Sequence, residues 1–312
     1  MKPPCSIVIR AYNEERHIGR LLEGIGQQSM AGAQIILVDS GSTDGTVAIA
    51  SRYPVDVVHL RPEEFTFGHS LNLGVARAEA EVVVIASAHV YPVYPDWLER
   101  LIAPFSAPNV ALVYGKQRGA EKTHFSEHMI FRQWFPETSV ARQGHPFCNN
   151  ANAAIRRALW EQHPYDESLP ALEDLAWARR AFENGGAIVY SAEAEVIHVH
   201  NETWQGVYNR YRREGMAFSR IYPQARFGLH DLARLFTGNA ASDLRAARRA
   251  GRLGAEWRGI VRFRWAQFYG TYQGYRQSGP LTEQLKQAFY YPRGIPHREP
   301  ERRDVEPIRY EG

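Results

Sequence analysis

The chain has 312 residues, of which 44% are hydrophobic and 23% are charged. These fractions are typical of a globular protein and exclude disordered, collagen-like and disulfide-rich chains. Because Cys5 and Cys148 are the only cysteines, the sequence offers neither a disulfide framework nor a four-thiolate metal site. A reducing compartment is therefore expected.

The sequence predicts no signal peptide and no membrane span. Glu14 and Glu15 come too early for a signal peptide, and the apolar run at residues 82–88 is far shorter than the roughly 18 residues that span a bilayer. We expect a cytoplasmic protein, either free or bound peripherally at the inner face of the cell membrane. Its net charge of +3 is unevenly distributed, since residues 205–312 contain 20 Lys and Arg against 10 Asp and Glu.

Short apolar runs alternate with amphipathic stretches in the first part of the chain. The pattern predicts strands at residues 5–11, 35–38, 56–59 and 82–86, and helices at residues 16–27, 46–53 and 69–80. Ser42 or Asp44 is expected to cap the helix at residues 46–53. This alternation predicts an α/β fold with a mostly parallel, doubly wound sheet. Ligands bind such sheets beyond the carboxyl ends of the strands.

The rest of the chain is less regular. We predict helices at residues 96–103 and 171–184, and strands at 110–116, 187–190 and 195–200, and leave residues 122–144 unassigned. From residue 203 to 291 the pattern is helical, and the tail from about residue 292 is expected to be loosely ordered. These patterns divide the chain into an α/β domain at 1–204 and a basic helical extension at 205–312.

Polar residues follow three of the predicted strands at the point where each strand ends. They are Ala11-Tyr12-Asn13-Glu14, Asp39-Ser40-Gly41 and Ser87-Ala88-His89. The three groups together predict one crevice at the sheet edge. A capped turn is an equally good account of residues 39–45 taken alone.

Two segments carry a resemblance to a known family. Residues 6–15 (SIVIRAYNEE) and 36–46 (ILVDSGSTDGT) resemble the family 2 glycosyltransferases, which have the GT-A fold. Asn72-x-Gly74, Ala153-x-Ile155-Arg156-Arg157 and Glu173-Asp174 extend the match over roughly residues 4–200. Phe67-Gly68-His69, placed before Asn72-x-Gly74, looks most like the rhamnosyltransferase-like branch. The resemblance implies a Rossmann-like, mostly parallel sheet flanked by helices, with an α-helical C-terminal extension.

The resemblance implies an inverting transfer from a UDP-, dTDP- or GDP-sugar to a saccharide or lipid-linked saccharide, in bacterial surface-polysaccharide synthesis. A carboxylate at Asp39 suits the N–H of the donor's base. Arg77 could reach a phosphate, although a solvated arginine on a helix face is the plainer account. The residues implied to bind the donor are Ala11, Tyr12, Asn13, Glu14, Asp39, Ser40, Arg77 and Ser87.

The sequence departs from the family at the metal motif. Family members usually carry Asp-x-Asp where this chain has Ser87-Ala88-His89. A single imidazole ligates borderline divalent ions better than it ligates Mg²⁺. His198 and His200 share one face by the strand period of two. We predict a reduced metal site formed by His89 with His198 or His200, favouring Mn²⁺ over Mg²⁺. The open alternative is metal-independent transfer, in which His89 and an arginine neutralise the pyrophosphate.

Asp174 matches the family's base, and Glu173 would position it. A carboxylate at a helix N-terminus is also explained by the helix dipole. Asn149 and Asn150 suit sugar hydroxyls, and Trp204 could stack on a sugar ring, although burial in the core is the commoner fate of a tryptophan.

The positive charge of the helical extension has two explanations of equal weight. Residues 205–264 contain 13 basic and 4 acidic residues interleaved with aromatic ones, a pattern that suits an anionic membrane surface. The other explanation is a helical bundle packed on the catalytic domain or on a second subunit, as in a homodimer. No nucleic-acid recognition motif accompanies the charge.

Two rival functions remain to be weighed. A nucleotidyltransferase would carry a Gly-rich, basic phosphate loop after the first strand, and Ala11-Tyr12-Asn13-Glu14 is not one. A sugar- or nucleotide-binding relative that lost activity with its Asp-x-Asp is argued against by the retained Glu173-Asp174 pair. A glycosyltransferase is therefore the function that the sequence favours.

Overall fold

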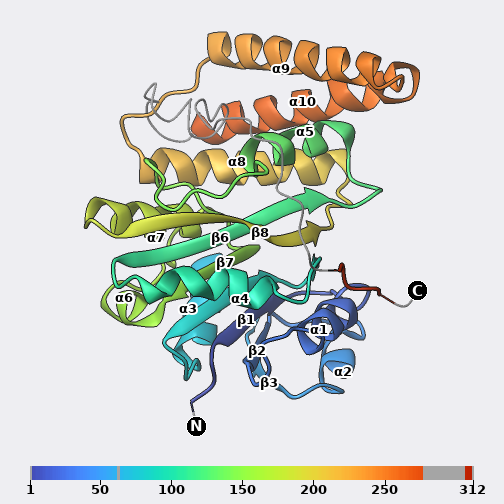
Figure 1. Cartoon of the computed structure of the whole chain (residues 1–312). Coiled ribbons are helices and arrows are strands. Elements are labelled where there is room, and N and C mark those ends of the chain that lie inside the picture. Colours follow the sequence, from blue (N-terminus) through green and yellow to red (C-terminus); the bar gives the residue numbers. More distant parts are fainter. Residues whose placement is uncertain (1, 62–63, 277–305, 311–312) are drawn as a thin grey trace.

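The computed structural model describes residues 2–61, 64–276 and 306–310 (Figure 1). Its strands are β1 (Ser6–Ala11), β2 (Gln34–Asp39), β3 (Val55–His59), β4 (Val82–Ser87), β5 (Val90–Pro92), β6 (Val110–Gly119), β7 (Asn152–Arg156) and β8 (Ala187–His198). Its helices are α1 (Ile18–Gly26), α2 (Thr46–Ala50), α3 (Phe67–Ala76), α4 (Trp97–Ile102), η2 (Ala103–Ser106), α5 (Phe125–Trp134), α6 (Arg157–Gln162), α7 (Glu173–Glu183), α8 (Trp204–Ile221), α9 (Leu229–Arg249) and α10 (Leu253–Tyr275).

The described strands form one eight-stranded sheet with the order β3-β2-β1-β4-β7-β6-β8-β5. The first four strands are parallel, as the alternating pattern predicts. β7 then runs antiparallel to both β4 and β6, and β5 runs antiparallel to β8, so the sheet is mixed. The α/β fold is confirmed, and its parallel half carries the three polar strand ends.

The closing part of the sheet differs from the prediction. The two short strands expected at residues 187–190 and 195–200 are one long strand, β8, which pairs in parallel with β6. The pairing shifts register between Gly115 and Gln117, which marks a β-bulge or irregularity in the ladder. The unassigned stretch at residues 122–144 contains α5. β8 ends at His198, and α5 packs close to that end through the contact of Glu127 with His200.

Alternate residues of the central strands enter two different hydrophobic clusters. Ile7 and Ile9 of β1 pack with α1, α2 and α4, whereas Val8 packs with α3 and α7 on the opposite face. The strand period of two therefore buries both faces, which explains the continuous apolar run of β1. Gly74 allows α3 to approach closely, since a Cβ at this position would lie 2.4 Å from Val8 Cγ1.

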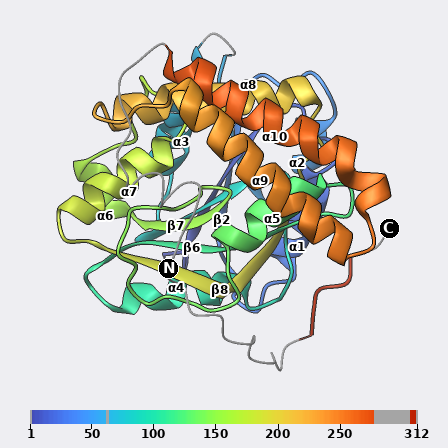
Figure 2. The same ribbon diagram turned by 90° about the horizontal axis from the view of Figure 1, so that it is seen from above.

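The C-terminal helices pack as layers over α5 and α7, with α9 and α10 on the outside (Figures 1 and 2). Phe218 and Phe268 share one buried cluster with Leu175 of α7, and Phe263 shares another with Ile130 of α5. The predicted helix at residues 277–291 and most of the predicted tail lie outside the described residues. In the described parts of the chain, no helix is both long and apolar enough to cross a membrane.

Residues 306–310 lie beside α1 and β5, which are more than 200 positions earlier in the sequence (Figure 1). Ile308 N donates to Val93 O at 2.9 Å, and the Tyr310 hydroxyl donates to Pro92 O. The Tyr310 ring also contacts the Tyr91 ring, with 5.9 Å between their centroids. These contacts hold residues 306–310 against the end of β5.

Candidate active site

The loops after β1 and β2 are joined by hydrogen bonds at the carboxyl edge of the sheet. Asn13 N donates to Ser42 Oγ at 2.9 Å, and Thr43 N donates back to Asn13 Oδ1 at 2.8 Å. Glu14 N donates to Thr46 Oγ1 at 2.7 Å. Asn13 adopts a positive φ of 55°, which asparagine tolerates better than most residues. The first two polar groups predicted from the sequence thus form one surface.

Asp39 is buried at the base of this surface. Its Oδ2 accepts from Gly41 N at 3.3 Å and from Ser42 N at 3.2 Å, so the capped-turn account of this segment holds. Asp44 Oδ1 likewise accepts from Thr46 N at 3.0 Å at the start of α2. Tyr12 stands exposed at the edge nearby, whereas Ala11 and Ser40 are buried at the strand ends. A carboxylate with about four acceptor positions retains capacity for a ligand N–H.

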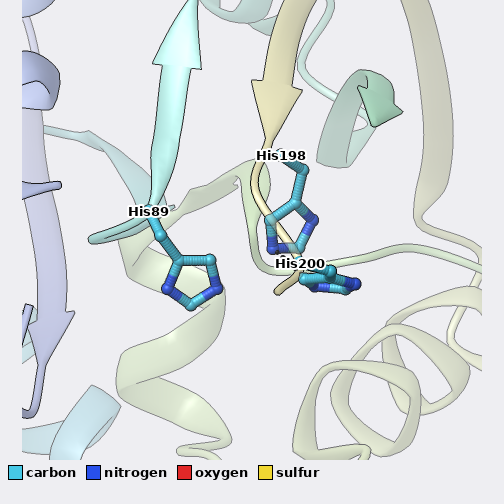
Figure 3. Close-up of side chains that lie close together, drawn as sticks. All are labelled: His89, His198 and His200. Carbon is cyan, nitrogen blue, oxygen red and sulfur yellow. Dashed lines mark hydrogen bonds between the residues drawn. The ribbon is translucent and has the colours of Figure 1, made fainter. Parts of the chain in front are cut away.

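Three histidines meet where β4 and β8 end (Figure 3). His89 follows β4, and its ring stacks on His198 with 5.1 Å between centroids. The Nε2 atoms of His198 and His200 lie 3.0 Å apart. One ligand nitrogen from each of the three rings lies within 4.8 Å of the others. The structure therefore brings together all three predicted metal ligands.

Each ring is oriented by an acceptor at its Nδ1. The partners are Glu14 Oε1 for His89 at 2.7 Å, Gln117 Oε1 for His198 at 2.8 Å and Glu127 Oε1 for His200 at 2.7 Å. Gln117 Nε2 donates to Asn149 Oδ1 at 3.1 Å, which leaves the Gln117 oxygen facing His198. With the protons assigned to Nδ1, all three Nε2 atoms carry lone pairs, as in the usual outer shell of a metal-bound histidine.

This donor set fits a borderline divalent cation. Neutral imidazole is the form that ligates a metal, and burial together with His200 and His89 holds the pKa of His198 well below its ordinary value. Two nitrogens about 2.1 Å from one ion at a right angle would be about 3 Å apart, which matches His198 and His200. Ser87 Oγ lies 3.1 Å from His89 Nε2 and adds an oxygen to the cluster.

A buried ionic network supports His200 from the side of the C-terminal helices. Glu127 of α5 accepts from Arg210 of α8 at 2.6 Å, and Arg210 also contacts Glu202 at 2.6 Å. Burial opposes ionisation of Glu127, but Arg210 and His200 lower its pKa to about 2. Glu127 is therefore ionised and holds the Nδ1 proton of His200 in place.

Glu173 and Asp174 begin α7 after a strained residue. Leu172 adopts a left-handed conformation with φ of 57°, which is rare for a side chain of this kind. Glu173 pairs with Arg10 of β1 at 3.2 Å, and Asp174 Oδ2 accepts from Asn150 N at 3.1 Å. Burial, reinforced by the Glu173 charge, raises the pKa of Asp174 to about 7. A carboxyl group with this pKa suits proton exchange near neutral pH.

The carboxylates and the histidines are parts of one site. Asn149 accepts from Gln117, the partner of His198, and the next residue, Asn150, binds Asp174 through its backbone. Arg10, the partner of Glu173, lies opposite Ser87 in the pairing of β1 with β4. Ser87 in turn contacts His89, so the Glu173 ion pair lies on the strand next to the one that leads to His89. The predicted residues Asn149 and Asn150 thus bridge the two groups.

Two arginines flank one aromatic ring next to the carboxylates. The guanidinium carbon of Arg10 lies 4.9 Å from the centroid of Phe67, and that of Arg213 lies 5.1 Å from it. Arg10 also donates to Phe67 O at 3.3 Å. These contacts bring positive charge from β1 and α8 to the side of the site that holds Glu173.

The structure places Arg77, one of the predicted binding residues, away from the site. Arg77 lies at the amino end of the sheet, where its carbonyl accepts from Gln34 at 3.1 Å and its side chain lies 3.6 Å from Asp56. The prediction that Arg77 reaches a phosphate is therefore wrong, because α3 runs away from the carboxyl edge. Trp204 is half-buried and stacks on His124, with 4.4 Å between ring centroids, and its stacking on a sugar ring stays a prediction.

Four residues that support the site were not predicted from the sequence. Gln117 and Glu127 orient histidines, whereas Arg10 and Arg210 neutralise buried carboxylates. Glu127 lies in the stretch without a clear period, and Arg210 is one of many arginines in the rear part. Neither residue has a spacing that connects it to the His-x-His pair.

Comparison with known proteins identifies the family. The model of the family "Glycosyl transferase family 2" matches residues 6–163, which is more than half of the chain. The chain belongs to glycosyl transferase family 2. It is therefore a glycosyltransferase, and the nucleotidyltransferase alternative is wrong.

Two relatives of this family 2 glycosyltransferase are O-antigen chain rhamnosyltransferases. RfbN of Salmonella typhimurium is 27% identical over 226 residues, covering 68% of this chain and 71% of the relative. WbaN of Salmonella anatum is 28% identical and covers 69% and 72%. These two relatives confirm the resemblance to the rhamnosyltransferase-like branch.

Solved structures support the GT-A fold. The mannosyltransferase PcManGT from Pyrobaculum calidifontis, in complex with GDP-Man and Mn²⁺, has a TM-score of 0.60 at 20% identity and covers 87% of this chain and 86% of that chain. TarS 1–349 of S. aureus, in complex with UDP-GlcNAc, has a TM-score of 0.54 at 16% identity and covers 89% and 92%. At these identities the likeness establishes the fold alone.

Proposed function

We propose that this glycosyltransferase transfers a rhamnosyl-type sugar from a nucleoside diphosphate-sugar to a saccharide acceptor during assembly of a bacterial surface polysaccharide. The observation that carries the chemistry is the continuous site formed by His89, His198 and His200 with Asp174. The sugar and the pathway are supported by the two O-antigen chain rhamnosyltransferases among the relatives.

The donor binds at the surface formed by the β1–α1 and β2–α2 loops. Asp39 accepts the imide N–H of the base, which suits UDP, dTDP or GDP, and Tyr12 offers an exposed ring for stacking. Ala11, Asn13, Glu14 and Ser40 shape this surface, and Ser87 borders the diphosphate.

His89, His198 and His200 would hold a divalent cation, and imidazole ligands favour Mn²⁺ over Mg²⁺. Mn²⁺ is present in the PcManGT structure and in that of glucosyl-3-phosphoglycerate synthase from Mycobacterium tuberculosis, which has a TM-score of 0.53 at 20% identity. Bound there, the cation would neutralise charge on the donor diphosphate. Glu14, Gln117 and Glu127 keep the three Nε2 atoms free for this role.

Asp174 acts as the base in a single displacement. Its carboxylate takes the proton of the acceptor hydroxyl, and the acceptor oxygen bonds to the anomeric carbon as the bond from that carbon to the diphosphate oxygen breaks. Attack from the face opposite the leaving group inverts the anomeric configuration. Glu173, fixed by Arg10, and the amides of Asn149 and Asn150 position Asp174 and the acceptor.

The division into a catalytic part at residues 1–204 and an extension at 205–312 remains a prediction. α8 contributes Arg210 to the support of His200 and Arg213 to the carboxylate side of the site. We therefore propose that the extension completes the active site as well as packing on it.

Calorimetric titration with UDP, dTDP, GDP and CMP, each with Mn²⁺ and then with a chelator, tests this proposal. We expect one of the first three nucleotides to bind, with an affinity that falls when Mn²⁺ is removed. Tight binding that ignores Mn²⁺ would leave the diphosphate to His89 and arginine, and would overturn the metal role. Absence of binding by all four would indicate an inactive relative.

A further inference from the structure

The outer helix α10 exposes a row of large apolar side chains. Trp257, Val261 and Trp265 are exposed by 45%, 36% and 47%. Their spacing of four residues places them on one face of the helix. Other aromatic residues of the extension, such as Tyr211, Phe218 and Phe263, are buried and hold the helices together. Packing within the chain therefore explains most of the aromatic residues of the extension. In the row, Trp265 contacts Phe236 and Tyr269, with 5.5 Å and 5.3 Å between ring centroids, yet nearly half of its side chain stays exposed.

Helices α9 and α10 carry positive charge that their acidic residues do not neutralise. Residues 229–276 contain nine arginines and three acidic residues. Asp243 pairs with buried Arg264, Asp231 with Arg234 and Glu256 with Arg252. Within the described residues, the remaining arginines form no ion pair, and all of them are exposed: Arg245, Arg248, Arg249, Arg258, Arg262 and Arg276.

We propose that the outer face of α9 and α10 binds an anionic phospholipid surface. Trp257 and Trp265 suit the headgroup level of a bilayer, where amphipathic rings collect. Arg258 and Arg262 lie beside this row, and the Arg258 guanidinium lies 5.2 Å from the Trp257 ring centroid. Arginines at this position pair with lipid phosphates. The combination of an apolar row with unneutralised arginines is typical of helices that lie in the membrane interface.

Charge argues against a second copy of the chain as the partner. Two copies that met through this face would bring their unpaired arginines together, and like charges across an interface are unfavourable. An anionic lipid surface instead complements this positive charge. The layer is also outermost in both views of the molecule, with α5 and α8 beneath it (Figures 1 and 2).

A short chain of contacts connects this face to the active site. Arg264 of α10 is held by Asp243 of α9 at 2.7 Å, and its Nη2 donates to Ser126 O of α5 at 3.5 Å. The next residue, Glu127, orients His200. One helix thus separates the lipid-binding face from the histidine cluster, an arrangement that suits an acceptor anchored in the membrane.

Vesicle sedimentation with the full chain, in the absence of donor, tests the inference independently of catalysis. We expect binding to vesicles of phosphatidylcholine mixed with phosphatidylglycerol, little binding to phosphatidylcholine alone, and weaker binding at high salt. The double variant Arg258→Gln/Arg262→Gln should bind about 30-fold more weakly, from the contributions of two arginines at an anionic surface. Trp257→Ser should also weaken binding to the mixed vesicles.

Arg52→Gln/Arg142→Gln is the matched control, because it removes the same charge from exposed positions outside the extension. It should bind like the unmodified protein, and thermal melting should show that all variants are folded. Equal losses in both double variants, or no vesicle binding by the unmodified protein, would overturn the proposal. So would a dimer in light scattering that Trp265→Ser dissociates, or a preference for a single-stranded oligonucleotide over the vesicles.

Discussion

His198 and His200 hold their Nε2 atoms 3.0 Å apart, although neither nitrogen carries a proton when both rings donate from Nδ1. Two lone pairs at this distance repel each other, and a cation between them would remove that repulsion. Burial keeps His198 from acquiring a proton, since it lowers the pKa of that ring. This geometry supports the metal role proposed for the pair.

His198→Asn should weaken Mn²⁺ binding by at least tenfold, because it removes one of the three proposed ligands and a ring that burial keeps neutral. Calorimetric titration with Mn²⁺ measures the loss. His230→Asn, at an exposed position at the start of α9, should leave Mn²⁺ affinity unchanged. Equal Mn²⁺ affinity in His198→Asn and the unmodified protein would place the metal elsewhere.

Glu127→Gln should lower the free energy of unfolding by about 3 kcal/mol, because it leaves a largely buried Arg210 with Glu202 alone. The Glu127 side chain is only 2% exposed, so solvent screening is weak. The same change should weaken Mn²⁺ binding through His200, by about tenfold. Urea denaturation checks the first effect and calorimetry the second. Unchanged stability would show that Glu202 alone satisfies Arg210.

Asp174→Asn should reduce turnover by about 10²-fold or more while nucleotide affinity stays within a factor of a few, because the amide cannot accept the acceptor proton. Single-turnover kinetics and nucleotide titration separate the two effects. Asp166→Asn, at an exposed position beside Ser168, is the control and should retain turnover. Full activity in Asp174→Asn would assign the base to another residue.

The rate should depend on pH through Asp174. Only the ionised carboxylate accepts a proton, so kcat/KM should fall as the pH drops below about 7, the pKa to which burial raises Asp174. Arg10 opposes that rise, and Arg10→Gln should move the acidic limb to higher pH. Arg52→Gln should not move it. An acidic limb at the same pH in Arg10→Gln and the unmodified protein would contradict this assignment.

Gly74→Ala should destabilise the fold by about 1–3 kcal/mol, because the new Cβ would lie 2.4 Å from Val8 Cγ1 in the packed contact between α3 and β1. Gly26→Ala is the matched control, since a Cβ there meets nothing within 4 Å at the end of α1. It should be neutral or slightly stabilising. Thermal unfolding of the two variants gives the comparison, and equal melting temperatures would show that α3 can shift.

Local patterns in the sequence were enough to predict the parallel half of the sheet. β1, β2 and β4 are short apolar runs bounded by polar turns, and the structure confirms them within a residue or two. Parallel strands bring their carboxyl ends to one edge, so the grouping of Asp39 with Asn13 followed from topology. The His-x-His spacing likewise predicted that His198 and His200 lie on one side at the end of β8.

Only the tertiary structure decided which distant residues support the site. Glu127 and Arg210 meet His200 because α5 and α8 pack at the end of β8, and no local period encodes that contact. The direction of α3 carried Arg77 to the opposite edge, where it lies beside Asp56. Secondary structure follows from neighbours in sequence, whereas side-chain partners depend on how helices pack against the sheet.

The basic helical extension shows the same distinction between what the sequence and the tertiary structure determine. Its charge and aromatic content are plain in the sequence, but composition could not separate Phe263, which is buried, from Trp257 and Trp265, which are exposed. Both kinds of residue recur at helical spacing in α10, and only the packing of α8 and α5 against one side of it determines which face is left for solvent. The sequence determined that the extension is basic and helical, and the tertiary structure decided which of its residues face outward.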